Sequence, residues 1–241
     1  MLFNRIGDMS LMLLLALLGV RFGSADFAFV GFIGTTASLR VVSRACMLAL
    51  IASMGKSAQL RLHSWLPNAI EAPTPVSALI HAATLVTARV YMLSRLSLLF
   101  EVKALGRVIL IGALTLLFAR LIRTIQTDLK RVIAYSTCSQ VAYMTLAMLA
   151  GLFEPGITLL VMHAAYKALL FLGAGVVIHA VRGIQDMRLM GGIGYSIPFT
   201  ALIMLIASAA LGAIPYTSRD YSKDLIIEQT LGVTRIVTNW A

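Results

Sequence analysis

Long apolar runs dominate this chain and restrict its fold more than any other feature. Several runs reach the roughly 20 residues that a helix needs to cross about 30 Å of hydrocarbon. The 241 residues are 59% hydrophobic and only 12% charged, whereas a water-soluble domain of this length carries a larger charged surface. Because non-helical backbone facing lipid leaves N–H and C=O groups unpaired, the sequence predicts an all-α polytopic membrane protein.

The turns between the apolar runs predict about seven transmembrane helices, two of them interrupted. One interruption is expected at 67–75, where three prolines cannot continue a regular helix, and the other at 212–215. Basic residues are divided nearly equally between alternate loops, so the positive-inside rule gives no orientation. The predicted spans are 3–20, 42–66, 76–99, 105–125, a fifth helix ending near 151, 157–181, and a seventh that starts at 198 and resumes near 222.

The net charge of +10 does not indicate a nucleic-acid-binding protein, because the basic residues sit singly between apolar segments and suit contact with lipid headgroups. Cys46 and Cys138 lie in apolar stretches without metal-ligand or CxxC spacing, so we interpret them as core residues. The sequence has no Gly-rich phosphate loop, no paired nucleophile and base, and no set of metal ligands. We therefore expect no cofactor, no metal and no redox chemistry in this chain.

Two lysines, Lys56 and Lys167, fall within apolar runs. A lysine at bilayer depth costs at least about 2.5 to 3.5 kcal/mol and usually faces a protein interior or a wet cavity. Burial disfavours the ammonium and a nearby carboxylate restores it, so such a lysine can gain and lose a proton reversibly. The alternative, a lysine that extends its stem to the interface, stays open for Lys130 and Arg131, which lie beside Asp128 at a helix end.

The histidines indicate proton transfer less specifically than the two lysines do. His81 and His163 are either hydrogen-bonded core residues or proton carriers, and His179 is more readily a core residue. Arg5 and Asp8 are spaced to share a helix face, and we interpret them as a structural ion pair.

Lys56 and Lys223 each lie beside one of the two predicted interruptions. Paired broken helices are typical of transporters built from pseudo-symmetric repeats. We therefore predict one transmembrane domain, in which residues 1–104 form the end of a first repeat and residues 105–241 form most of a second.

Several blocks of the chain together form a recognisable pattern. They are 56–60, 65–69, 71–84, 128–137, 162–172 and 221–224. These blocks closely resemble the antiporter-like subunit 5 of NADH dehydrogenase, respiratory complex I, occur in that family's order and cover nearly the whole chain.

The resemblance implies a membrane-arm subunit that moves protons while other subunits oxidise NADH and reduce ubiquinone. It also implies a proton path and a set of supporting residues. The path residues are Lys56, His81, Lys130, His163, Lys167 and Lys223, and the supporting residues are Arg5, Asp8, Glu71, Asp128 and Asp224. Its implied location is the mitochondrial inner membrane, with a bacterial plasma membrane as second choice.

The chain departs from the family's pattern in residues and in length. The family usually has a small residue or proline at Arg61, an aspartate at Asn68, and glycine at Ala72 and Arg89. Arg89 adds a charge that must find a partner or an interface. Family members also have helices before and after this stretch, one of which carries a glutamate paired with the central lysine. We therefore expect a split or shortened subunit whose partners, beside other membrane-arm subunits and lipids, are separate chains that supply the missing helices.

Two other functions stay open. The large subunit of a multisubunit cation/proton antiporter shares the block at 71–78, although 78–88 reads more like the respiratory form. A structural subunit that scaffolds its neighbours but has lost pumping is the other alternative, and retention of all four matched lysines argues against it.

Overall fold

The computed structural model describes residues 2–24, 26, 38–59, 62–82, 84–96 and 105–239, without the side chains of 39, 105–110 and 233–239. Within these ranges the chain is helical, apart from turns and one isolated β-bridge. Arg61 and most of the loop after the first helix lie outside the described residues. The prediction of an all-α protein is confirmed.

The helices vary from single turns to 28 residues. In chain order they are α1 (Leu2–Phe22), α3 (Leu39–Lys56), α4 (Trp65–Asn68), η1 (Ala69–Glu71), α5 (Thr74–Ala82), α6 (Ala88–Arg95), α7 (Leu105–Ile125), α8 (Leu129–Leu149), α9 (Phe153–Ala180), η4 (Met187–Leu189), α10 (Ile193–Ser196), α11 (Pro198–Gly212) and α12 (Asp220–Asn239).

The seven predicted spans correspond to α1, α3, the α5–α6 pair, α7, α8, α9 and the α11–α12 pair. Among the described residues, three helices are long enough and apolar enough to cross a membrane by length and composition, namely α1, α8 and α9. Pro198 occupies the first turn of α11, as expected for a residue with no backbone N–H to donate.

Two predicted spans are wrong in their boundaries. The helix expected over 42–66 ends at Lys56, because Ala58 adopts a left-handed φ of 50° that ends the helical path. The helix expected over 76–99 is divided into α5 and α6 by the turn at 84–87. That turn contains no glycine or proline that could signal a break.

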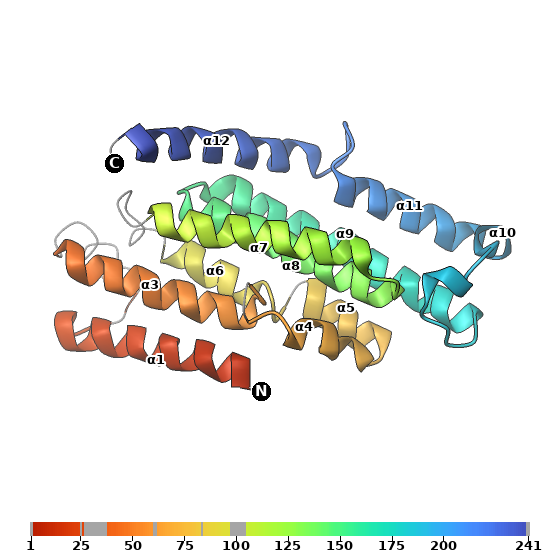
Figure 1. The fold of residues 1–241 in the computed structure, drawn as a ribbon, viewed down its shortest axis with the longest axis horizontal. Coiled ribbons are helices and arrows are strands. Elements are labelled where there is room, and N and C mark those ends of the chain that lie inside the picture. Colours follow the sequence, from red (N-terminus) through yellow and green to blue (C-terminus); the bar gives the residue numbers. More distant parts are fainter. Residues whose placement is uncertain are drawn as a thin grey trace.

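Helix α8 lies at the centre of the bundle, and most of its residues are buried. It packs against α7 and α9, while α5 and α11 pack against α9 (Figure 1). Helices α11 and α12 follow one another along the same edge of the molecule, and α1 lies beside α3 at the opposite edge. This arrangement surrounds α8 with elements that carry charged side chains.

Helices α1 and α3 approach one another at two glycines. A Cβ on Gly55 would lie 2.9 Å from Gly7 Cα, and a Cβ on Gly7 would lie 3.2 Å from Gly55 Cα. Only residues without side chains permit such close backbone packing, which is typical of helix pairs in membranes. The contact places Asp8, the residue after Gly7, beside the end of α3.

The polar loop after α9 is joined to the start of α8. Leu129 N donates to Gln185 O at 3.0 Å and Met187 N donates to Thr127 O at 3.0 Å, so Asp128 and Asp186 form an antiparallel bridge. In this loop, hydrogen bonds from the Arg188 side chain and backbone hold the pKa of Asp186 below its usual value.

Candidate functional site

Asp8 on α1 binds two basic side chains from different helices. Its Oδ1 accepts a hydrogen bond from Arg89 Nη2 at 2.8 Å and lies 3.4 Å from Lys56 Nζ. Arg89 also donates from Nη1 to Ala52 O at 3.2 Å, and its side chain is only 7% exposed. The predicted Arg5–Asp8 ion pair is therefore wrong: Arg5 is exposed, and the carboxylate is taken by partners from α3 and α6.

Lys56 is the last residue of α3. The unpaired carbonyls at a helix C-terminus favour a positive charge. The turn that follows is held by Ser57 Oγ, which donates to Val86 O at 3.0 Å, and by Gln59 Nε2, which donates to Thr145 Oγ1 at 2.6 Å. Cys138 Sγ donates to Ala58 O at 2.9 Å. Lys56 therefore stands at a helix end whose position is fixed by α8 and the α5–α6 turn.

Lys167 on α9 is fully buried, with no exposed surface. Its Nζ donates to Ile133 O at 2.8 Å and to Ser136 Oγ, both on α8. No carboxylate of a described residue pairs with it. Among the described residues, its ammonium is therefore held only by neutral oxygens.

Two buried histidines flank Lys167. His163, one turn earlier on α9, lies with Nδ1 3.2 Å from Ala82 O at the end of α5. His81 on α5 stacks on Phe171, one turn after Lys167, with ring centroids 4.9 Å apart and an interplanar angle of 23°. Residues 163, 167 and 171 share one face of α9 because their spacing is four. The fold thus places both predicted histidines along the same α5–α9 contact as Lys167.

The histidine rings retain hydrogen-bonding capacity in this interior. Both ring nitrogens of His81 and Nε2 of His163 are buried and have no hydrogen-bond partner among the described residues, and the same holds for Tyr166 Oη. Buried polar atoms of this kind are normally satisfied by ordered water. These ring nitrogens are therefore available to further hydrogen-bond partners.

Lys130 lies in the first turn of α8 and is buried, with 6% of its surface exposed. It precedes Ile133, whose carbonyl accepts from Lys167, by three residues. The neighbouring Asp128 pairs with Arg131 at 3.0 Å and not with Lys130. The burial of Lys130 excludes the alternative of an exposed, interfacial lysine, while Arg131, half exposed, fits that alternative.

Lys223 lies in the first turn of α12, after the break that follows α11. It lines a cavity of about 540 Å³ together with three arginines, Arg120, Arg123 and Arg219. Asp224 and Glu71 are exposed and lie outside the contacts described for the buried lysines. The predicted path residues other than Lys130 are therefore distributed over three groups. Lys56 belongs to the Asp8 cluster (Asp8, Lys56 and Arg89), and His81, His163 and Lys167 form the Lys167 cluster. Lys223 lines the third group, the Lys223 cavity.

Three contributing residues were missed or incompletely understood from the sequence. Ser136 accepts from Lys167, Arg219 lies beside Lys223, and Asp8 is the partner of Arg89. A search for oppositely charged pairs among residues inside apolar runs would have found the Asp8–Arg89 pair. Nothing in the spacing of Ser136 or Arg219 indicated their roles.

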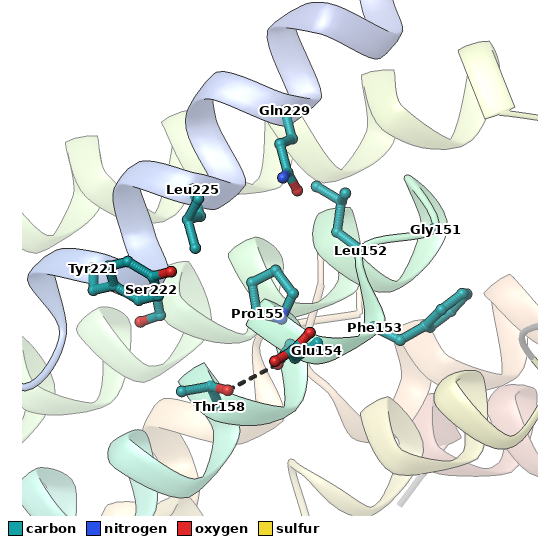
Figure 2. A pocket seen from close by; sticks show the side chains of 10 residues that line it. All are labelled: Gly151, Leu152, Phe153, Glu154, Pro155, Thr158, Tyr221, Ser222, Leu225 and Gln229. Atoms are coloured by element: carbon teal, nitrogen blue, oxygen red, sulfur yellow. Dashed lines mark hydrogen bonds between the residues drawn. The ribbon is translucent and has the colours of Figure 1, made fainter.

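A second cavity, of about 580 Å³, lies where the α8–α9 turn meets α12 (Figure 2). Glu154 lies at this cavity, and Thr158 Oγ1 donates to its backbone carbonyl at 2.9 Å. None of the predicted path residues lines it. The predicted path lysines and histidines therefore lie outside this second cavity.

Comparisons with known proteins agree with the resemblance. Residues 1–241 match the family model described as NADH:quinone oxidoreductase/Mrp antiporter, TM. Three curated relatives bear the name NADH-ubiquinone oxidoreductase chain 5. They come from Allomyces macrogynus (49% identical over 100% of this chain), Metridium senile (51% over 95%) and Arabidopsis thaliana (44% over 100%). The chain spans 38% of the length of each of these relatives.

A solved structure of an Mrp complex from Dietzia sp. DQ12-45-1b contains a similar chain. It matches with a TM-score of 0.89 and 29% identity over 95% of this chain and 26% of that chain. The lower identity makes it a more distant relative than the chain 5 proteins. Together with the full-length family match, these comparisons show that the chain belongs to the NADH:quinone oxidoreductase/Mrp antiporter transmembrane family.

Proposed function

We propose that this chain is part of a membrane-arm subunit of proton-translocating NADH:ubiquinone oxidoreductase and carries protons along its buried lysines and histidines. Its own role is proton transfer, while electron transfer to quinone takes place in other subunits of the enzyme. The observation that carries the proposal is the α5–α9 contact. There Lys167 is fully buried between His163 and Phe171, and the Phe171 ring stacks on His81.

The proposed path begins at Lys56 and ends at Lys223. Lys56 is the C-terminal residue of α3, where the helix dipole favours the ammonium, whereas Lys223 lies in the first turn of α12, where the dipole disfavours it. Each effect amounts to about 0.3 to 1 kcal/mol and up to about 2 kcal/mol when partly buried. Proton uptake at Lys56 and release at Lys223 agree with this difference.

Between these ends, His81, Lys130, His163 and Lys167 carry the proton. Lys167 holds its position through Ile133 O and Ser136, and three ring nitrogens of the neighbouring His81 and His163 have no hydrogen-bond partner among the described residues. Hydrated links are necessary because a dry gap between lysines stops transfer. Asp8 is the charged partner of Lys56, and Arg89 competes with Lys56 for it. Arg5, Glu71, Asp128 and Asp224 have supporting roles outside the path itself.

The proposed location is the mitochondrial inner membrane, and the proposed partners are the other membrane-arm subunits. Segments corresponding to the rest of the relatives' length complete the two repeats that we place at residues 1–104 and 105–241. The Lys56 side chain is 34% exposed, which leaves room for a second carboxylate from such a segment beside Asp8. A carboxylate there adds a second counter-charge beside Lys56.

Native purification tests the assignment. The chain is isolated from its own membrane in gentle detergent, and the proteins that accompany it are identified by mass spectrometry. We expect subunits that oxidise NADH and subunits that form the quinone site, together with polypeptide supplying the remaining helices. Recovery with only small hydrophobic antiporter subunits contradicts the proposal.

The second candidate is a subunit of a cation/proton antiporter, and the TM-score of 0.89 with a chain of the Mrp complex supports it. The higher identity to chain 5 proteins, 44 to 51%, favours the respiratory enzyme. Ion dependence separates the two: an antiporter moves protons in response to a sodium gradient without NADH, and the respiratory enzyme does not.

A further inference from the structure

Arg219 lies at the break between α11 and α12 (Figure 1) and binds an oxygen from each of two other elements. Its Nη1 donates to Leu211 O and its Nη2 donates to Gln140 Oε1. Leu211 is in the last turn of α11, where backbone carbonyls have no acceptor role within the helix. Gln140 is a buried residue of α8. The guanidinium therefore joins the C-terminal end of α11 to the central helix of the bundle.

The Arg219 side chain is enclosed in the way a bound cation is. It is 1% exposed, and its guanidinium carbon lies 6.0 Å from the ring centroids of both Tyr143 and Tyr166. Aromatic rings at this distance attract cations. No carboxylate of a described residue forms an ion pair with Arg219, whereas Asp220 and Asp224 act electrostatically on Lys223. Neutral oxygens and aromatic rings thus hold the Arg219 charge.

The oxygens bound by Arg219 are of the kinds that bind metal cations. In transporters with broken helices, the carbonyls at the C-terminal end of a half-helix coordinate sodium, and Leu211 O has this position on α11. Hard cations also accept side-chain amide oxygens such as Gln140 Oε1. Ser139 and Thr124 line the same cavity, and their hydroxyls can supply further oxygens. The break therefore contains the ligands of a cation site, and Arg219 occupies two of them.

We propose that Arg219 is a tethered cation that fills this site and closes the Lys223 cavity to sodium, so that the path admits only protons. The other basic residues of the cavity are Arg120, Arg123 and Lys223. Guanidinium and ammonium groups have no lone pair for a metal ion, whereas a neutral lysine amine accepts a proton. Arg219 is thus a specificity-determining residue. The inference rests on the proposed function, because it concerns the ion that the path carries.

Equilibrium dialysis of the purified complex against radioactive sodium tests the proposal. Arg219→Ser removes the guanidinium and frees both Leu211 O and Gln140 Oε1. We expect this variant complex to gain a saturable sodium site, from which unlabelled sodium displaces the label and choline does not. Arg219→Lys keeps a tethered positive charge at the break and is expected to bind no more sodium than the unaltered complex.

Arg120→Gln is the matched control for the loss of charge. It removes one positive charge from the same cavity and leaves Arg219 bonded to Leu211 O and Gln140 Oε1. We expect it to gain no sodium site. A site of equal affinity in Arg120→Gln and Arg219→Ser overturns the proposal, because repulsion by the cavity charges, and not occupancy of the two oxygens, then excludes sodium.

Proton translocation gives a second measurement. The NADH-driven rate is compared in sodium chloride and in choline chloride at equal ionic strength. Sodium at its measured dissociation constant fills half of the sites in Arg219→Ser, so we expect about a twofold loss of rate in this variant. The unaltered complex is expected to translocate equally in both salts. Specific inhibition of the unaltered complex by sodium overturns the proposal, even when no Arg219 variant assembles.

The binding measurement separates this inference from the proposed function, because it needs no turnover. An assembled Arg219→Ser complex without an additional sodium site overturns the tethered cation and leaves the proton path standing. A sodium site in Arg219→Ser, together with an unchanged proton-to-NADH ratio in Lys167→Met, supports the tethered cation and contradicts only the path through Lys167.

Discussion

Asp8 and Arg89 are 81 residues apart in the chain, yet Arg89 Nη2 donates to Asp8 Oδ1 at 2.8 Å, the same oxygen that lies 3.4 Å from Lys56 Nζ. One carboxylate oxygen therefore serves two cations. The arginine is always charged, whereas the lysine can lose its proton. Arg89 thus competes with Lys56 for this oxygen.

Replacing Arg89 tests this competition. Arg89→Gln keeps a hydrogen-bond donor near Asp8 and removes the positive charge, so Lys56 becomes the only cation beside Asp8 Oδ1 among the described residues. We expect slower NADH-driven proton translocation, because the Asp8–Lys56 ion pair no longer shares its carboxylate oxygen with Arg89. Arg44→Gln, on the exposed side of α3, serves as control. An unchanged rate in an assembled Arg89→Gln complex contradicts the competition.

Removing the carboxylate leaves both cations without their counter-charge. Asp8→Asn is expected to destabilise the protein by about 1 to 3 kcal/mol, less than a fully buried pair, because the Asp8 side chain is 35% exposed and water screens it. Combining Asp8→Asn with Arg89→Gln restores part of that loss. Thermal unfolding of the two single variants and the double variant measures the coupling, and strictly additive effects rule out an energetically meaningful pair.

The close approach of α1 and α3 sets the position of the Asp8 cluster. Gly55→Ala introduces a Cβ 2.9 Å from Gly7 Cα, a backbone atom that cannot rotate away, so the helices must separate. We expect a loss of about 1 to 3 kcal/mol from overpacking together with weaker proton translocation. Gly19→Ala on α1, where a Cβ meets nothing within 4 Å, is the matched control. Equal stability of the two variants refutes the close packing.

Ser136 is expected to hold the Lys167 ammonium in place. Ser136→Ala removes one of the two oxygens that Lys167 Nζ contacts and leaves Ile133 O as the other. A lost hydrogen bond to a charged group amounts to about 1.5 to 3 kcal/mol, so we expect slower proton translocation and a lower unfolding temperature. Ser208→Ala, whose hydroxyl bonds to its own helix at Leu205 O on exposed α11, should behave as the unaltered protein.

The sequence predicted the broad fold and the burial of Lys167, because both depend on local composition. The span 105–125 matches α7, and the break at 212–215 matches the gap between α11 and α12. These features follow from apolar length and from Gly and Pro, which act within a few residues.

Features that depend on distant contacts were not predicted. The end of α3 at Lys56 is fixed by Ser57, Gln59 and Cys138, whose partners lie 29, 86 and 80 residues away. The pairing of Asp8 with Arg89 instead of Arg5 likewise depends on how α1 and α6 meet. Local spacing favoured Arg5, three residues from Asp8, as the partner. In the folded chain Arg89 pairs with Asp8 instead and is more buried than Arg5.

Lys167→Met tests the central claim, that buried lysines of this chain carry protons in the respiratory enzyme. Methionine preserves the length and burial of the side chain and removes the ammonium. The measurement is the number of protons translocated per NADH oxidised by the purified complex in sealed vesicles, with assembly checked by native electrophoresis. We predict a lower ratio in a fully assembled variant complex. An unchanged ratio, with NADH oxidation and assembly intact, contradicts a proton path through Lys167.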